Sequence, residues 1–228
     1  SLLDSIELLK KSKGGKGKLI SGTSLSDPAN VLIIGAGIVG INAMQMSLGL
    51  GANTTILDIN NELLSKIKTQ YPAVNIGTSS KELIEGLLPI ADVVIGAVLT
   101  PGAKPPTVIT KEMLSLMQDK SILSDVAIDQ GGCFETSKPT THSEPTYEID
   151  GVIHYCVKNI PSAVPFTATN ALNESTRPFI ARLANEGVEG LRSNINLLMA
   201  LNTYDGHLVN KEVADAHGLE YSDPSNIL

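Results

Sequence analysis

Cysteine is scarce in this chain of 228 residues, and its two cysteines do not form a binding motif. Cys133 and Cys156 are far apart in the sequence, and neither belongs to a CxxC pair. This usage argues against a disulfide framework and against a zinc site. We therefore expect reduced thiols, no metal centre and a cytoplasmic protein.

Long apolar runs and an excess of positive charge are also missing. No stretch approaches the length of a membrane span, and the first residues lack the basic region that precedes the apolar core of a signal peptide. The net charge of −7 disfavours nucleic acid and anionic membranes as partners. The chain does contain 42% hydrophobic residues, which suffices for the core of one large domain, or of one domain plus a fragment of another.

An apolar run that ends in three spaced glycines is the most informative stretch. Residues 31–34 read as a buried strand, and Gly35 allows a tight turn after it. Gly37 lets a pyrophosphate approach the backbone, and Gly40 lets the next helix pack close to the sheet. That helix, roughly residues 38–50, would direct its free N–H groups and the positive end of its dipole at the phosphates.

A second apolar run, residues 54–57, ends at Asp58. An acid at this distance from the glycines is placed to accept hydrogen bonds from an adenosine ribose, and it would repel the 2′-phosphate of NADP. The alternative is a glycine-rich turn that binds no nucleotide, with Asp58 as an ordinary strand-end acid. Strand, glycines, helix, second strand and acid together favour NAD binding.

Strand and helix patterns alternate along the rest of the first 160 residues. Further strands are expected at residues 92–98, 121–128 and 152–157, the last of the chain, and helices at 61–70, 80–88 and from Thr110. This alternation predicts an α/β fold of the Rossmann type, with a doubly wound parallel sheet.

The two ends of the chain read differently. Residues 1–11 have helical spacing, and residues 13–18 read as a flexible basic turn because they lack the ending of a phosphate loop. After Pro161 we expect helices at 168–187 and 191–201, a polar tail, and too little strand pattern for another sheet. The expected division is a connecting helix and turn at 1–20, an NAD-binding domain at 21–165, and C-terminal helices of an incomplete second domain at 166–228. A first residue already within a helix pattern suggests a truncated start.

Ligands of an open α/β sheet lie at the carboxyl ends of its strands. Three segments should meet there: residues 35–40, residues 97–104 with a Pro-Gly turn at 101–102, and residues 129–135. Asp129 is the best catalytic candidate, since a carboxylate near a nicotinamide could transfer a proton or hold an ammonium group or water. An equally weighted alternative is a loop acid bonded to the N–H groups of Gly131 and Gly132. We expect Asp125, four residues earlier, to be structural.

Other titratable side chains are given structural or solvent roles. His142 reads as a structural loop histidine, and His154, on one strand face with Cys156, reads as a packed neutral ring. Lys104 reads as a solvated loop lysine. Cys133 has no histidine base beside it in sequence, which argues against a nucleophile.

Five segments closely resemble bacterial L-alanine dehydrogenases, and the resemblance extends over nearly the whole chain. They are residues 31–40, 92–104, 125–135, 138–142 and 154–165. The Asp-Gln-Gly-Gly-Cys-Phe-Glu segment at 129–135 is the most specific, and the related transhydrogenase α subunit differs there.

The resemblance implies oxidative deamination of L-alanine to pyruvate and ammonium with NAD, and a catalytic role for Asp129 beside the nicotinamide. Family cofactor contacts fall, besides the three glycines, on Ile38, Val39, Asp58, Ser79, Val98, Leu99, Val126, Ala127, Ile128, Val157, Lys158, Asn159 and Ile160. Lys138 matches a basic cofactor contact, whereas Leu63 stands where relatives have a basic residue.

The family's substrate-binding arginine and lysine and its catalytic histidine come from an N-terminal segment that has no counterpart here. The resemblance therefore implies a chain that is inactive alone and that works as a homo-oligomer or with an N-terminal partner chain. Two alternatives remain: a non-catalytic nucleotide-binding subunit that requires a partner, and transhydrogenase-like exchange between NAD and NADP. Asp58 and the 129–135 segment argue against the exchange.

Overall fold

The computed structural model describes residues 1–100 and 103–228, which form two compact units. The first unit comprises residues 1–100 and 104–160, and the second comprises residues 103 and 161–228. The Pro-Gly turn expected at 101–102 lies outside the described residues. No helix in the two described ranges combines the length and the apolar character that a bilayer crossing requires.

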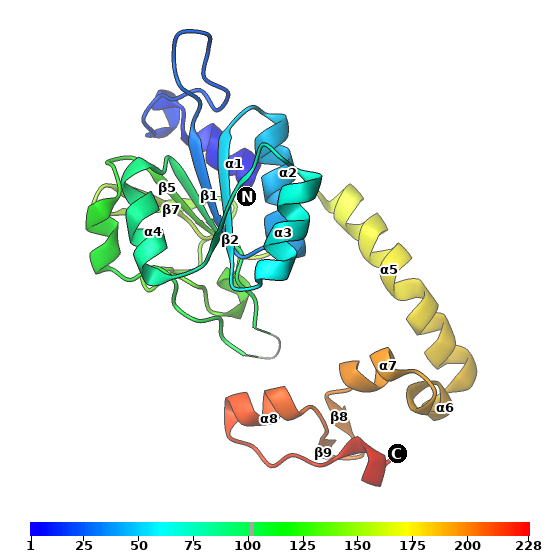
Figure 1. The fold of residues 1–228 in the computed structure, drawn as a ribbon. Coiled ribbons are helices and arrows are strands. Elements are labelled where there is room, and N and C mark those ends of the chain that lie inside the picture. Colours follow the sequence, from blue (N-terminus) through cyan, green and yellow to red (C-terminus); the bar gives the residue numbers. More distant parts are fainter. Residues whose placement is uncertain (101–102) are drawn as a thin grey trace. The chain divides into compact units, whose positions relative to one another are not determined.

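A seven-stranded sheet forms the centre of the first unit (Figure 1). Its order is β3 (Asn75–Thr78), β2 (Asn53–Asp58), β1 (Asn30–Ile34), β4 (Val93–Gly96), β5 (Ile122–Asp125), β7 (Val152–Tyr155) and β6 (Thr146–Ile149). All neighbours are parallel except the β6–β7 pair. The predicted Rossmann-type α/β fold is confirmed, with an antiparallel strand added at one edge. The strand order reverses between β1 and β4, where such sheets bind ligands.

Helices cover both faces of this sheet. The first face carries α1 (Leu2–Leu8), α2 (Ile38–Gly49) and α3 (Asn61–Gln70), and the second carries α4 (Lys81–Leu87) with two 3₁₀ turns, η2 (Leu88–Ile90) and η3 (Glu112–Leu116) (Figure 1). Side chains of β1 alternate between the two resulting cores: Val31 and Ile33 pack with Met44, while Leu32 and Ile34 pack with Leu114. Burial on both faces explains why residues 31–34 of β1 are all apolar.

The sequence does not predict β3 and β6. Both are short strands at the edges of the sheet, and neither contains a buried residue. Without buried positions a strand has no run of apolar residues by which to recognise it.

The strand expected at 121–128 ends earlier than predicted. β5 stops at Asp125, and a 3₁₀ turn, η4 (Ile128–Gln130), follows. The buried Asp125 carboxylate accepts a hydrogen bond from the N–H of Ala127, 3.0 Å away, and so turns the chain out of the sheet. Asp125 and Asp129 therefore do not share a strand face.

The basic segment at 13–18 forms the predicted turn, but two of its lysines are anchored to a buried carboxylate. After a 3₁₀ turn, η1 (Lys11–Lys13), the amines of Lys16 and Lys18 lie 3.0 and 2.6 Å from the carboxylate oxygens of Asp92. The N–H of Asn30 donates to the same carboxylate over 2.8 Å. Burial would raise the pKa of Asp92, but these three donors outweigh it and hold that pKa below its ordinary value.

The second unit contains more structure than the sequence indicates. Its elements are α5 (Pro165–Glu186), α6 (Val188–Arg192), α7 (Ile195–Ala200), β8 (Thr203–Tyr204), β9 (His207–Leu208) and α8 (Lys211–His217). The single helix expected at 191–201 is broken because the Asn194 side chain caps α7, accepting from the N–H groups of Asn196 and Leu197.

The strands β8 and β9 form a small hairpin, so the expectation of no further strand after residue 157 is wrong. Asp205 and Gly206 at its tip both have positive φ, of 48° and 81°. An Asp-Gly pair with left-handed backbone is the typical two-residue hairpin turn, so this dipeptide was the available signal.

Candidate functional site

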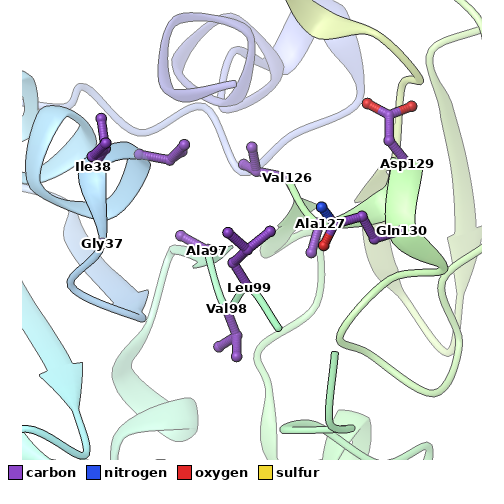
Figure 2. Close-up of a pocket in the computed structure, with 10 residues that line it drawn as sticks. Gly37, Ile38, Ala97, Val98, Leu99, Val126, Ala127, Asp129 and Gln130 are labelled. Atoms are coloured by element: carbon purple, nitrogen blue, oxygen red, sulfur yellow. The ribbon is translucent and has the colours of Figure 1, made fainter. Parts of the chain in front are cut away.

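A pocket of about 450 Å³ opens at the carboxyl ends of β1, β4 and β5. Its lining is mostly apolar and consists of Gly37, Ile38, Val39, Ala97, Val98, Leu99, Val126, Ala127, Asp129 and Gln130 (Figure 2). The three loops expected to meet at the strand ends do meet here. In Figure 2 the apolar side chains of Ala97, Leu99 and Val126 lie between Ile38 and Asp129.

The three glycines after β1 are required for different reasons. Gly35 has a φ of +104°, which side chains rarely tolerate, and a Cβ there would lie 2.5 Å from the carbonyl oxygen of Ala97. A Cβ on Gly40 would overlap the carbonyl oxygen of Gly35, so the close approach of α2 to the turn depends on it. Gly37 differs, because no protein atom lies within 4 Å of the position of its Cβ. The space beside Gly37 is open to a ligand.

The amino end of α2 points into this open space. Gly37 is the N-cap, and it makes no side-chain cap hydrogen bond. The first N–H groups of a helix have no partner within the helix, and with the helix dipole they favour an anion. Ile38 is 84% exposed beside them, and its side chain lines the pocket.

Asp58, at the end of β2, is tied to the glycine turn. One carboxylate oxygen accepts from the N–H of Ala36 over 2.6 Å, and the other accepts from the N–H of Asn60 over 2.9 Å. The backbone N–H of Ser79, which follows β3, donates to the carbonyl of Asp58 over 2.9 Å. A carboxylate has about four acceptor positions, so Asp58 can support the turn and still accept from two ribose hydroxyls.

Asp129 is exposed at the pocket, and the alternative of a loop acid bonded to the following glycines is wrong. The N–H groups of Gly131 and Gly132 donate to the carbonyls of Ile128 and Ala127. Asp129 instead accepts from the N–H of Asn159, which lies 3.2 Å from both carboxylate oxygens. This bond joins the loop after β5 to the loop after β7 and leaves the carboxylate accessible from the pocket.

Asp125 has the loop-organising role. It is fully buried, and its two oxygens accept from the N–H groups of Ala127, Cys133 and Phe134 and from the Ser137 hydroxyl, which is 2.5 Å away. Every donor belongs to the segment that follows Asp125, so this carboxylate shapes the loop that carries Asp129.

The remaining expected site residues lie outside the pocket lining. The side chains of Ile128 and Val157 are buried, and those of Lys138, Lys158 and Asn159 are exposed. Ile160 is half-buried. Val157 pairs with Thr140, which fixes the loop after β7. A ligand that contacted the loop after β7 would lie next to the hydrogen bond between Asn159 and Asp129.

Ala97 and Gln130 line the pocket but were not singled out as contacts from the sequence. Both lie in the segments expected at the strand ends, so their position was the available signal.

His154 is buried and neutral, as predicted. The Nδ1 of His154 donates to the carbonyl of Val152 over 3.0 Å, so its Nε2 accepts from the Thr136 hydroxyl over 2.8 Å. Burial lowers the pKa of His154, and its ring stacks on Tyr147. Burial, followed by the charge of Asp125, raises the pKa of the Cys133 thiol, which agrees with the prediction that it is not a nucleophile.

Comparison with known proteins finds one family and closely similar relatives. The family described as "Alanine dehydrogenase/PNT, C-terminal domain" matches residues 1–211. An alanine dehydrogenase of Halomonas elongata is 47% identical over 96% of this chain and 60% of its own length. One from Staphylococcus haemolyticus is 46% identical over 97% of this chain and, again, 60% of its own length. The chain thus spans about 60% of the length of these relatives.

Solved structures agree. An L-alanine dehydrogenase superposes on 95% of this chain with a TM-score of 0.87 and 41% identity, and the match covers 60% of that protein. A transhydrogenase from Sinorhizobium meliloti superposes on 73% of this chain and 48% of its own, with a TM-score of 0.62 and 20% identity. The second likeness shows a shared fold alone.

Proposed function

The chain belongs to the alanine dehydrogenase/PNT C-terminal domain family, and on that basis we propose that it is the NAD-binding and C-terminal portion of an L-alanine dehydrogenase. The whole enzyme would oxidise L-alanine to pyruvate and ammonium. NAD would supply the acceptor for the hydride removed from the substrate. The residues of this chain would bind and orient NAD and would place one carboxylate beside the reacting atoms.

The observation that carries this proposal is the open space at Gly37. The fold tolerates a side chain there, since no protein atom approaches, yet the residue is glycine and lies at the amino end of α2. A pyrophosphate fits this position, because it needs close access to backbone N–H groups. Asp58 then lies where the adenosine ribose would be, and the apolar ends of β4 and β5 lie where a nicotinamide ring would be.

We assign the proposed cofactor contacts to the strand-end loops. They are Gly35, Gly37, Ile38, Val39, Gly40, Asp58, Ser79, Val98, Leu99, Val126, Ala127, Ile128, Lys138, Val157, Lys158, Asn159 and Ile160. Asp129 is the proposed catalytic residue: its exposed carboxylate, oriented by the Asn159 N–H, can hold the ammonium group of the substrate or accept its proton.

Apart from Asp129, we place the substrate-binding residues in the part of the longer relatives that this chain does not cover. The relatives are longer, and in α5 the side chains of Phe166, Leu172 and Ile180 are each more than 60% exposed. A helix with this apolar exposure is suited to packing against more protein. The occupant would be an N-terminal segment of the enzyme, in the same chain or in a partner chain, within a homo-oligomer.

The decisive experiment is a fluorescence titration of this chain with NADH, followed by addition of L-alanine and NAD at alkaline pH. We expect NADH to bind and alanine to be oxidised at a negligible rate. Absence of NADH binding would refute the cofactor site. Robust alanine-dependent NADH formation would show that this chain supplies the whole substrate site, contrary to the proposal.

Two further functions give different outcomes. A non-catalytic nucleotide-binding subunit would bind NADH, and a separate N-terminal polypeptide would restore activity on mixing. Transhydrogenase-like exchange would require NADPH to bind as tightly as NADH, whereas Asp58 beside the expected ribose should repel the 2′-phosphate.

A further inference from the structure

Two carboxylates lie near the floor of the pocket, and only one of them faces solvent. Asp129 lines the pocket and is exposed, whereas Asp125 is fully buried behind the wall. The nearer oxygen of Asp125 lies 3.0 Å from the N–H nitrogen of Ala127, and Ala127 itself lines the pocket. A residue of the pocket lining therefore donates its backbone N–H to the buried carboxylate.

The Asp125 carboxylate has hydrogen-bond donors around it but no counter-charge. Its partners are the N–H groups of Ala127, Cys133 and Phe134 and the Ser137 hydroxyl, with the Cys133 thiol at 3.5 Å. In the described part of the chain none of these partners is a cation. A site with donors only at both oxygens suits the ionised carboxylate and leaves its negative charge uncompensated.

The backbone is built to admit this charge. Gly132 has a φ of +77°, and a Cβ there would lie 2.8 Å from an oxygen of Asp125 and 2.9 Å from the Ser137 side chain. Gly132 thus makes room for the buried carboxylate.

We propose that Asp125 biases the pocket toward the oxidised cofactor, by placing a buried negative charge behind the position of the nicotinamide ring. This inference rests on the proposed NAD site. The ring carries a positive charge in NAD⁺ and none in NADH, so the field of Asp125 stabilises only the oxidised form. Because the carboxylate has no contact with water, solvent and salt screen it much less than they screen Asp129.

The test is the ratio of the dissociation constants of NAD⁺ and NADH for the full chain, measured by calorimetry for each cofactor. Asp125→Asn removes the charge and keeps the shape, and we expect the NAD⁺/NADH ratio of dissociation constants to rise roughly tenfold. A purely structural role would weaken both cofactors equally and leave the ratio unchanged.

A second variant tests the same inference should Asp125→Asn fail to fold. Ser137→Lys places an ammonium beside the carboxylate while Asp125 keeps its three backbone donors, so the ratio should rise in the same direction. Ser137→Ala is the matched control without a charge. Glu148→Gln removes one negative charge from the exposed Lys120–Glu148 pair, and neither control should move the ratio.

The outcomes separate this inference from the function on which it rests. A raised ratio in the charge-removing or charge-pairing variant, with both controls unchanged, supports Asp125 as a specificity residue for the oxidised ring. An unchanged ratio in the folded variants overturns it. Failure of the wild-type chain to bind either cofactor refutes the NAD site itself and the inference with it.

Discussion

Polar groups at the amino ends of the main sheet's strands (the amino edge) and at their carboxyl ends (the carboxyl edge) have opposite surroundings. At the amino edge the Asp92 carboxylate receives Lys16, Lys18 and the N–H of Asn30, and the carboxylate is nearly inaccessible to solvent. At the carboxyl edge α2 begins without a side-chain cap. Asp129 is exposed there, and within the described ranges its one backbone partner is the N–H of Asn159.

The amino-edge groups stabilise the fold, whereas the carboxyl-edge groups are available to bind a ligand. Paired and buried charges are costly to break, since an unpaired charge is left behind, so the amino edge should determine stability. Open donors beside exposed apolar side chains contribute little to folding and are available for binding. Substitutions at the two edges should therefore change different measurements.

The largest expected effect is at Asp92. Asp92→Ala removes the carboxylate that pairs with Lys16 and Lys18. We expect the free energy of unfolding to fall by about 3 kcal/mol, the lower end of the range for a broken buried pair, because both amines can turn toward water. Urea denaturation at pH 7 measures this loss. NADH affinity of the folded variant should stay at the wild-type value.

Glu148→Ala is the matched control, because its pair with Lys120 is exposed and should contribute less than about 1 kcal/mol. A loss at Asp92 no greater than that at Glu148 would mean that the buried cluster does not stabilise the protein. Loss of NADH binding in a folded Asp92→Ala protein would mean that the two edges are not independent.

The next effect compares two glycines three residues apart. Gly40→Ala places a Cβ against the carbonyl of Gly35, and we expect a loss of about 1–3 kcal/mol in unfolding free energy. This sign is diagnostic, since alanine normally stabilises a helix relative to glycine. Gly37→Ser adds a side chain in open space and a good N-cap, so stability should be kept while NADH binding weakens by about tenfold, or about 1.4 kcal/mol.

Urea denaturation and NADH titration of both variants decide the matter. Equal destabilisation by the two substitutions would remove the distinction between a packing glycine and a ligand glycine. Unweakened NADH binding by Gly37→Ser would contradict the position assigned to the pyrophosphate.

Local periodicity predicted the elements that bury a regular set of apolar side chains. β1, α2, β2 and α3 follow from apolar spacing and caps, and the glycine turn with Asp58 follows from one contiguous stretch. Features that depend on partners distant in sequence could not be predicted. Lys16 and Lys18 meet Asp92 from more than 70 positions away, and nothing in a lysine and glycine turn indicates that carboxylate.

In the candidate site, too, some features could be predicted from the sequence and others could not. The pocket loops follow from the convergence of strand ends in this fold, whereas the roles of Asp125, at the end of β5, and Asp129 depend on how the next loop folds back. Asp129 was weighed as a loop acid, yet Asp125 has that role because its oxygens face N–H groups brought round by the turn at Ala127 and by Gly132.

A smaller effect is the acid dependence of the amino edge. The folded pKa of Asp92 lies below its unfolded value of about 3.9, so its stabilisation is present above that value and is lost as the pH falls through the folded pKa. Lys18→Met should lower stability at pH 7 and flatten this acid loss, so that the two proteins converge toward pH 3. Urea midpoints between pH 7 and pH 3 measure the convergence. Lys120→Met should follow the wild-type acid profile, and a constant gap between wild type and Lys18→Met would contradict the assigned pairing.

The smallest expected signal is the reactivity of the thiols. It tests whether solvent at the carboxyl edge reaches only the pocket and not the residues behind its lining. Cys133 follows the glycine pair of the pocket loop, yet it is fully buried, and burial followed by the charge of Asp125 raises the pKa of its thiol. Burial likewise raises the pKa of Cys156. Since thiolate is the reactive form, a disulfide reagent at pH 8 should label neither cysteine in the folded protein and both in urea. Rapid labelling of Cys133 in the native chain, slowed by NADH, would show that the opening at this edge extends behind Ala127 and that Asp125 is not sealed from solvent.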